Sequence, residues 1–92
     1  MYRVRIYPEA RDAIASLPGV ALAGYAEALG VMKLVPWSGE SINKVNPGGE
    51  VRQLVFGPGA RGMVTYLVLE DQQLVDVLEV STAKLRSPLV AN

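Results

Sequence analysis

The segment Val51–Val80, VRQLVFGPGARGMVTYLVLEDQQLVDVLEV, constrains the fold more than any other part of the chain. It divides into three strand-like runs, 50–57, 62–70 and 73–80, which are separated by GPGARG and by EDQQ. The last two runs are almost continuously apolar, which is typical of strands in the centre of a sheet. Because short turns join consecutive strands, the segment predicts a three-stranded antiparallel meander.

The first residues predict one more strand. YRVRIY alternates, with Val4 and Ile6 on one face and Arg3 and Arg5 on the other, as in a half-buried strand. Pro8 ends this strand, and a proline also suits the first turn of a helix.

Two helices are expected next, over 8–17 and 20–35, joined by the short Leu-Pro-Gly link. Such a link predicts an antiparallel helix hairpin. The apolar stripe expected on the second helix consists of Leu22, Tyr25, Leu29 and Met32. Two glycines in the same helix, Gly24 and Gly30, are expected to let it approach another element closely.

The predicted fold class is therefore α+β: an N-terminal strand, an antiparallel two-helix hairpin and a three-stranded antiparallel meander in one mainly antiparallel sheet. A chain of 92 residues predicts a single domain, 1–92. The Pro-, Gly-, Ser- and Asn-rich stretch 36–50 predicts a loop, in which Trp37 plugs an edge of the core.

The amino-acid composition of the chain excludes several kinds of functional site. Nine Lys and Arg balance nine Asp and Glu, so a broad nucleic-acid-coating surface is not expected. Because the chain has no histidine and no cysteine, it has no disulfide and no histidine-based metal or catalytic site; we expect no cofactor and no metal. The sequence has neither a signal peptide nor an apolar stretch of membrane-spanning length, so a cytoplasmic protein is expected.

The mean hydropathy of +0.22 is high for so short a chain. One interpretation is an apolar surface that faces another protein. The other is that the many alanines raise the value.

The sequence does not match most of the known catalytic signatures. GPGARG lacks the Lys-Ser/Thr of a phosphate-binding loop and precedes a predicted strand, so nucleotide binding is not expected. Glu70 and Asp71 fall in a predicted turn. Asp76 and Glu79 lie three apart on a predicted strand and so should face opposite sides. We interpret these four carboxylates as solvated charges, not as a metal site.

Basic residues form the remaining constellation. A guanidinium can hold a phosphate with two hydrogen bonds and stabilise charge in a phosphoryl-transfer transition state. The alternative is a scatter of surface charges, which residue spacing alone favours. The candidates are Arg3, Arg5, Arg52, Arg61, Lys84 and Arg86.

Several segments in the same order resemble the RelE/ParE superfamily of toxins, the toxic partners in bacterial type II toxin–antitoxin pairs. They are VRIYPEARDAIASLP, the alanine- and leucine-rich second helix, PWSG and the segment 51–80, which together cover almost the whole chain. The resemblance implies a sheet with a helix hairpin and a cognate antitoxin as partner, with the helix hairpin and the exposed side of 20–35 as its platform.

The resemblance implies two activities. RelE-like members cleave messenger RNA on the ribosome, which would make Arg52, Arg61 and Arg86 the catalytic contacts and Arg3, Arg5 and Lys84 the RNA-binding ones. ParE-like members inhibit DNA gyrase and are not nucleases.

The sequence departs from the RelE pattern in several places. It has Leu54 and Met63 where that pattern often has basic residues, and SPLVAN contains no histidine or tyrosine. Tyr66, Tyr2 and Tyr7 are the remaining candidates for acid/base chemistry. The preferred hypothesis is a RelE-like ribonuclease that cleaves mRNA on the ribosome, and the alternative is a toxin-fold module that acts by contact or has lost its activity.

Overall fold

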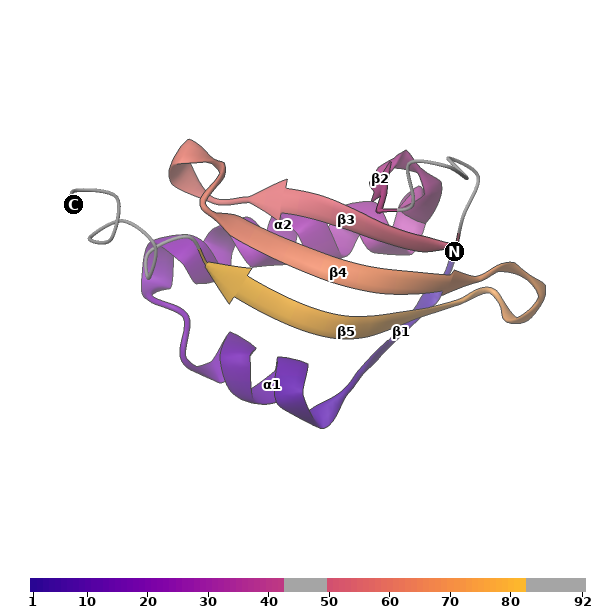
Figure 1. Cartoon of the computed structure of the whole chain (residues 1–92), viewed down its shortest axis with the longest axis horizontal. Helices are drawn as coiled ribbons and strands as arrows, with labels where there is room; N and C mark the ends of the chain where they lie inside the picture. The colour runs from indigo at the N-terminus through magenta and orange to yellow at the C-terminus, as the bar shows by residue number, and fades with distance from the viewer. Residues whose placement is uncertain (43–49, 83–92) are drawn as a thin grey trace.

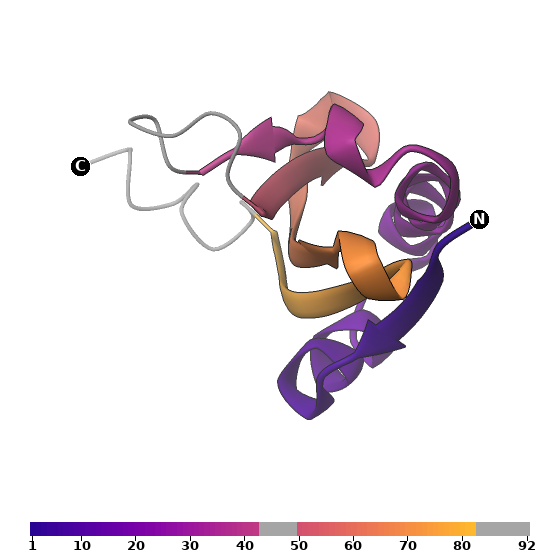
Figure 2. The same ribbon diagram turned by 90° about the vertical axis from the view of Figure 1, so that its right-hand side faces the viewer.

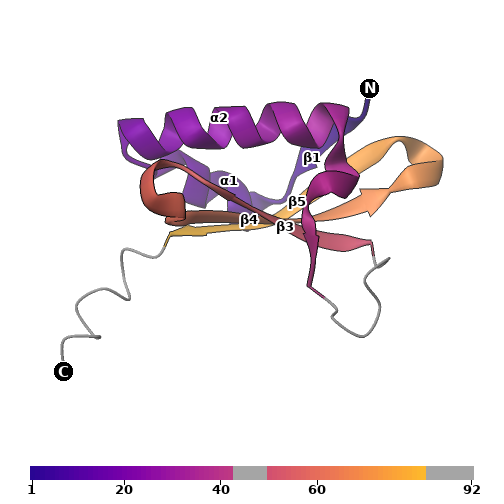
Figure 3. The ribbon, with the colours of Figure 1, turned by 90° about the horizontal axis from the view of Figure 1, so that it is seen from above.

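A twisted five-stranded sheet with two helices on one face makes up the computed structural model, which describes residues 1–42 and 50–82 (Figure 1, Figure 3). The strand order is β1-β5-β4-β3-β2, so β1 and β2 form opposite edges (Figure 2). In chain order, the elements are β1 (Arg3–Ile6), α1 (Pro8–Ala15), α2 (Gly19–Leu34), β2 (Glu40–Ser41), β3 (Val51–Phe56), β4 (Gly62–Leu69) and β5 (Leu74–Thr82).

The predicted α+β class is confirmed, with one parallel pair in the sheet. β1 runs parallel to β5, with Arg3 opposite Leu74 and Ile6 opposite Val77. The other pairs are antiparallel. The two apolar runs are β4 and β5, which have strands on both sides as predicted.

Strand β2 was not predicted. The stretch 36–50 was expected to be a loop, but Pro36–Ser38 form a 3-10 turn and Glu40–Ser41 pair with β3. Trp37 packs partly buried against the core, as predicted. The segment 43–49 lies outside the described residues.

Helix α2 packs on the sheet through its smallest residues. Its buried positions are Gly24, Tyr25, Ala28 and Met32. A Cβ at position 24 would lie 2.6 Å from the Cα of Gly57, so the predicted close approach is confirmed there. The same prediction is wrong for Gly30, where a Cβ would meet nothing within 4 Å.

The predicted apolar stripe of α2 is wrong at Leu22, which is exposed. Tyr25 and Met32 of that stripe are buried and Leu29 packs at the edge of the core. The helix buries a face that passes through Gly24 and Ala28 instead. Small side chains give the closest helix–sheet contact, so they displace the larger leucine from the interface.

A β-bulge in β5 corrects the prediction for the acidic residues. Thr65 lies opposite Glu79 and Tyr66 opposite Val77, so Leu78 is the extra residue. Because a bulge inserts one residue, Asp76 and Glu79 come to the same face of the sheet, and not to opposite faces. The face concerned is the one opposite the helices, which we call the open face.

Candidate functional site

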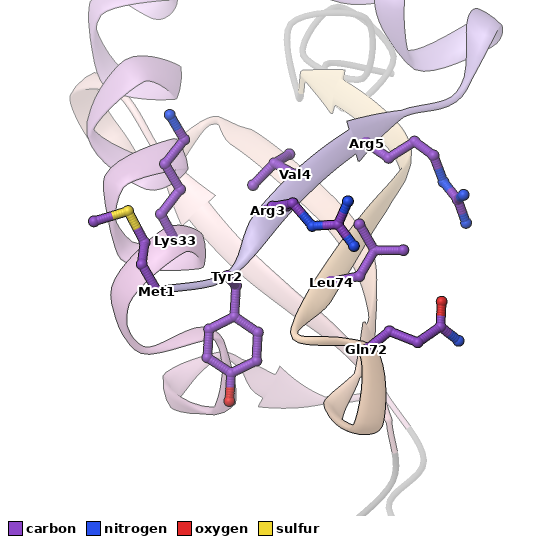
Figure 4. Close-up of a pocket in the computed structure, with 8 residues that line it drawn as sticks. All are labelled: Met1, Tyr2, Arg3, Val4, Arg5, Lys33, Gln72 and Leu74. Carbon is purple, nitrogen blue, oxygen red and sulfur yellow. The ribbon is translucent and has the colours of Figure 1, made fainter.

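A basic hollow surrounds the edge strand β1 (Figure 4). It has a volume of about 630 Å³. Three cationic side chains line it, Arg3 and Arg5 from β1 and Lys33 from the last turn of α2. The remaining lining residues are Met1, Tyr2, Val4, Gln72 and Leu74.

Arg5 is bound to Asp76. Its Nε lies 2.8 Å from Oδ1 of Asp76 and its Nη2 lies 3.0 Å from Oδ2. The carboxylate is only 2% exposed, so the interpretation of Asp76 as a solvated charge is wrong. These hydrogen bonds and the charge of Asp76 raise the pKa of Arg5. The guanidinium fixes β1 against β5 and has fewer donors left for a phosphate.

Lys33 was missed in the sequence. The Tyr2 N–H donates to the Lys33 carbonyl over 2.8 Å, which places the end of α2 beside the start of β1. Neither Arg3 nor Lys33 has a side-chain hydrogen bond or ion pair within residues 1–42 and 50–82. No local pattern signals this neighbourhood, because only the chain's return along α2 creates it.

Arg52 lies on the helix-covered side of the sheet. Its Nη1 donates to the carbonyl oxygens of Trp37 at 3.1 Å and of Gly39 at 2.8 Å. Its guanidinium carbon lies 4.9 Å from the centre of the Trp37 ring, a cation–π arrangement. Arg52 therefore holds the Pro36–Ser38 turn and β2 against β3.

The predicted catalytic arginines are not gathered at one place. Arg52 lies near the start of β3, whereas Arg61 follows the Pro58–Ala60 turn, which comes after the end of β3. At about 3.3 Å per strand residue, the length of β3 separates them by more than about 10 Å. Arg86 and Lys84 lie outside the described residues, and their assigned roles stay predictions, as do those of the other four.

Two of the three candidate acid/base tyrosines, Tyr66 and Tyr2, are engaged in other contacts. Tyr66 is fully buried, its hydroxyl donates to the Pro36 carbonyl over 2.6 Å, and burial raises its pKa. The Tyr2 hydroxyl donates to Glu70 Oε1 over 2.6 Å, which raises the pKa of Tyr2. Tyr7 is partly exposed beside α1. A phenol with a raised pKa is a poor general base at neutral pH.

Glu70 joins three parts of the chain. Its Oε1 accepts hydrogen bonds from Trp37 Nε1 at 2.7 Å and from Tyr2, and its Oε2 accepts one from Gln73 at 2.9 Å. The bonds from Trp37 and Tyr2 lower the pKa of Glu70. Such a stabilised carboxylate favours a structural role over proton transfer.

The centre of the open face is uncharged. Pairing of β3 with β4 places Gln53 opposite Thr65 and Val55 opposite Met63 on this face. Within the described strands, the charged residues of the open face lie toward the margins of that face. They are Glu40 on β2, Glu79 on β5, and Arg3, Arg5 and Asp76 at the β1 side.

Residues 1–42 and 50–82 contain no group of three or more carboxylates that could hold a metal ion. Neither helix in that part of the chain is long and apolar enough to cross a membrane.

No family model and no curated protein sequence matches the chain. Several solved structures do match the chain. The isolated Escherichia coli RelE toxin has a TM-score of 0.75 at 12% identity, over 99% of this chain and 97% of the toxin.

Two complexes match as well. The E. coli RelBE toxin–antitoxin complex matches with a TM-score of 0.71 at 16% identity, over 90% of this chain and 98% of the other. The RelBE2 complex of Mycobacterium tuberculosis matches with a TM-score of 0.69 at 22% identity, over 88% of this chain and 96% of the other. At the level of the fold, the resemblance is thereby confirmed: this chain has the fold of the RelE toxins.

Proposed function

We propose that this chain is the toxin component of a type II toxin–antitoxin system and that a cognate antitoxin neutralises it. The observation that carries the proposal is the match to a RelE toxin over 99% of the chain, together with matches to complexes that hold a toxin and an antitoxin. Such a toxin acts in the cytoplasm, where ribosomes and DNA gyrase are found.

The outer side of α2 supports an antitoxin partner. Leu34 is 64% exposed, and Leu22, Ala23 and Ala26 are exposed as well. Glu27 and Lys33 are the only charged residues of this helix. A helix that is apolar on all sides is usually covered on all sides, which favours the antitoxin platform predicted over 20–35.

Action by contact, as in toxins that inhibit gyrase, fits the described residues better than mRNA cleavage does. Arg52 is held by Trp37 and Gly39, and Tyr66 is buried. Among residues 1–42 and 50–82, no cation lies at the centre of the open face to hold a phosphate. The endoribonuclease hypothesis rests on Arg61 and Arg3, with Arg86 and Lys84 in the tail.

The test is induction of the chain alone in a bacterial host, with the neighbour-encoded antitoxin on a second promoter. We expect growth arrest that the antitoxin relieves, with no new 5′ ends in translated messages by primer extension. Inhibition of gyrase supercoiling by the purified chain identifies the contact target.

Two results overturn parts of the proposal. Absence of arrest and of antitoxin binding overturns the toxin assignment. The second result is cleavage within translated messages. If Arg61→Ala abolishes this cleavage and the matched Arg11→Ala variant on α1 retains it, action by contact is overturned and the ribonuclease hypothesis is established.

A further inference from the structure

A second hollow lies at the end of the molecule where the Pro58–Ala60 turn faces the start of α2 (Figure 3). It has a volume of about 450 Å³ and shares no lining residue with the basic hollow around β1. Sites for small organic molecules have volumes of this order. The lining comes from the link before α2, the first turn of α2, the segment 56–62 and the end of β5. We call this hollow the turn pocket.

The wall of the turn pocket is mostly apolar. Phe56 lines it on the sheet side and is 6% exposed. A Cβ at position 62 would overlap the ring of Phe56, so Gly62 leaves room for that ring. Val20 and Ala21 line the pocket on the α2 side, and Val20 is 68% exposed. Water in contact with such a wall favours an apolar molecule that covers it.

The turn that carries Arg61 has an unusual backbone. Gly57, Gly59 and Ala60 all have positive φ, of 80°, 69° and 55°. Glycine adopts this conformation readily, whereas alanine adopts it only at an energetic cost. Residues in such strained conformations are concentrated at functional sites. The Ala60 N–H donates to the Gly57 carbonyl over 3.0 Å, so the backbone that precedes Arg61 is held in place.

Among the described residues, Arg61 is the only charged one that lines the turn pocket. Its side chain folds back toward Gly59, where its Nε would lie 3.6 Å from a Cβ. Within residues 1–42 and 50–82 it has no side-chain hydrogen bond or ion pair. Thr82, whose backbone pairs with Gly62, adds a hydroxyl to the lining. A guanidinium with free donors beside an apolar wall favours an anion, and a carboxylate matches its two parallel N–H groups.

We propose that the turn pocket binds a small carboxylate that carries a compact aromatic or branched aliphatic body. The carboxylate pairs with the Arg61 guanidinium, and the body lies on Phe56 between Ala21 and Pro58. The apolar wall lowers the local dielectric constant, which strengthens this ion pair. Such a site goes beyond the proposed function and is independent of it, because it needs neither an antitoxin nor RNA.

A nucleotide phosphate is the competing ligand. Binding of a nucleic-acid backbone relies on several cations in succession. The part of the lining that the structure describes has one cation and a mostly apolar wall. It therefore favours a singly charged ligand with an apolar body.

The first experiment uses two probes that differ only in the charged group, 2-naphthoate and 2-naphthalenemethanol. Each probe is titrated into the isotope-labelled wild-type chain, and the amide chemical shifts are followed by NMR. We expect 2-naphthoate to shift the amides of Gly57, Gly59 and Gly62 with a Kd of about 1 mM or tighter, as is usual for so small a ligand. The uncharged alcohol should act on the same amides and bind about ten-fold more weakly.

The second experiment removes the charge from the protein. We expect Arg61→Met to weaken 2-naphthoate binding by about ten-fold and to change the affinity for the alcohol by less than about two-fold, because only the ion pair is lost. The same change at an exposed position of α1, Arg11→Met, is the matched control and should alter neither affinity. Circular dichroism confirms that each variant is folded.

A third pair of variants tests the apolar wall. We expect Val20→Ala to weaken the binding of both probes by about two- to three-fold, because part of the wall is removed. Val35→Ala makes the same change at an exposed position outside the turn pocket and should weaken neither.

Three results overturn the proposal. The first is equal affinity for the two probes, no saturable shift with either, or a 2-naphthoate affinity that Arg61→Met leaves unchanged. The second is a set of shifts confined to Leu22 and Leu34, which places the probes on the outer side of α2. The third is tighter binding of adenosine 5′-monophosphate than of 2-naphthoate at the same amides, lost in Arg61→Met, which assigns the pocket to a phosphate.

Discussion

Two buried tyrosines of the core differ in a single hydrogen bond. The Tyr66 hydroxyl donates to the Pro36 carbonyl, whereas the Tyr25 hydroxyl is buried without a partner in the described structure. A buried polar group that lacks a partner costs about 1–3 kcal/mol. We expect Tyr25→Phe to raise the free energy of unfolding by about 1 kcal/mol and Tyr66→Phe to lower it by a similar amount, measured by urea denaturation. Equal effects of the same sign would contradict this account.

At the same scale, the sequence predicts residue types but not their partners. Arg5 is visible as an outward residue of an alternating strand, yet Asp76, its partner, is 71 positions away. Arg52 was predicted as a catalytic residue because it starts a basic strand. Its contacts with Trp37 and Gly39 depend on how the intervening segment folds back. Such partners are set by tertiary packing, which no spacing rule encodes.

At the scale of elements, one glycine sets the distance between a helix and a strand. A Cβ at position 24 would lie 2.6 Å from both the N and the Cα of Gly57, atoms that cannot rotate away. We expect Gly24→Ala to lower the free energy of unfolding by about 1–3 kcal/mol. Gly30→Ala is the matched change in open space and should raise it by up to about 1 kcal/mol.

Thermal and urea unfolding of both variants check this prediction. Equal stability of Gly24→Ala and the wild type would mean that α2 can shift on the sheet without loss. The contact would then not define the position of the helix.

The elements themselves were largely predictable because their signals are local. The three strands of the meander, the first strand and both helices follow from alternation, apolar runs and Pro-Gly links. Strand β2 was missed because Glu40–Ser41 are too short for a periodic signal and pair only through β3. The bulge at Leu78 was missed because it is a property of the register between two strands, and it changes which face carries Glu79.

At the scale of the whole molecule, an apolar helix face remains in contact with solvent. The exposed side chains of Leu22 and Leu34, with the alanines between them, leave the outside of α2 apolar, and the net charge is zero. A neutral protein with such a face has little repulsion to oppose association. Without an antitoxin, we expect the wild-type chain to self-associate as its concentration rises.

The variant Leu22→Glu/Leu34→Glu, compared with a charge-matched control, tests whether the apolar face or the net charge governs association. It should stay monomeric in light scattering, and its unfolding free energy should change by less than about 0.5 kcal/mol, because both side chains are exposed. It should also bind the antitoxin less tightly. The control Gln72→Glu/Ser81→Glu adds the same charge at exposed positions outside α2 and the turn that follows it. If the control suppresses association equally, charge and not the helix face governs it, and the case for an antitoxin platform on α2 loses its physical basis.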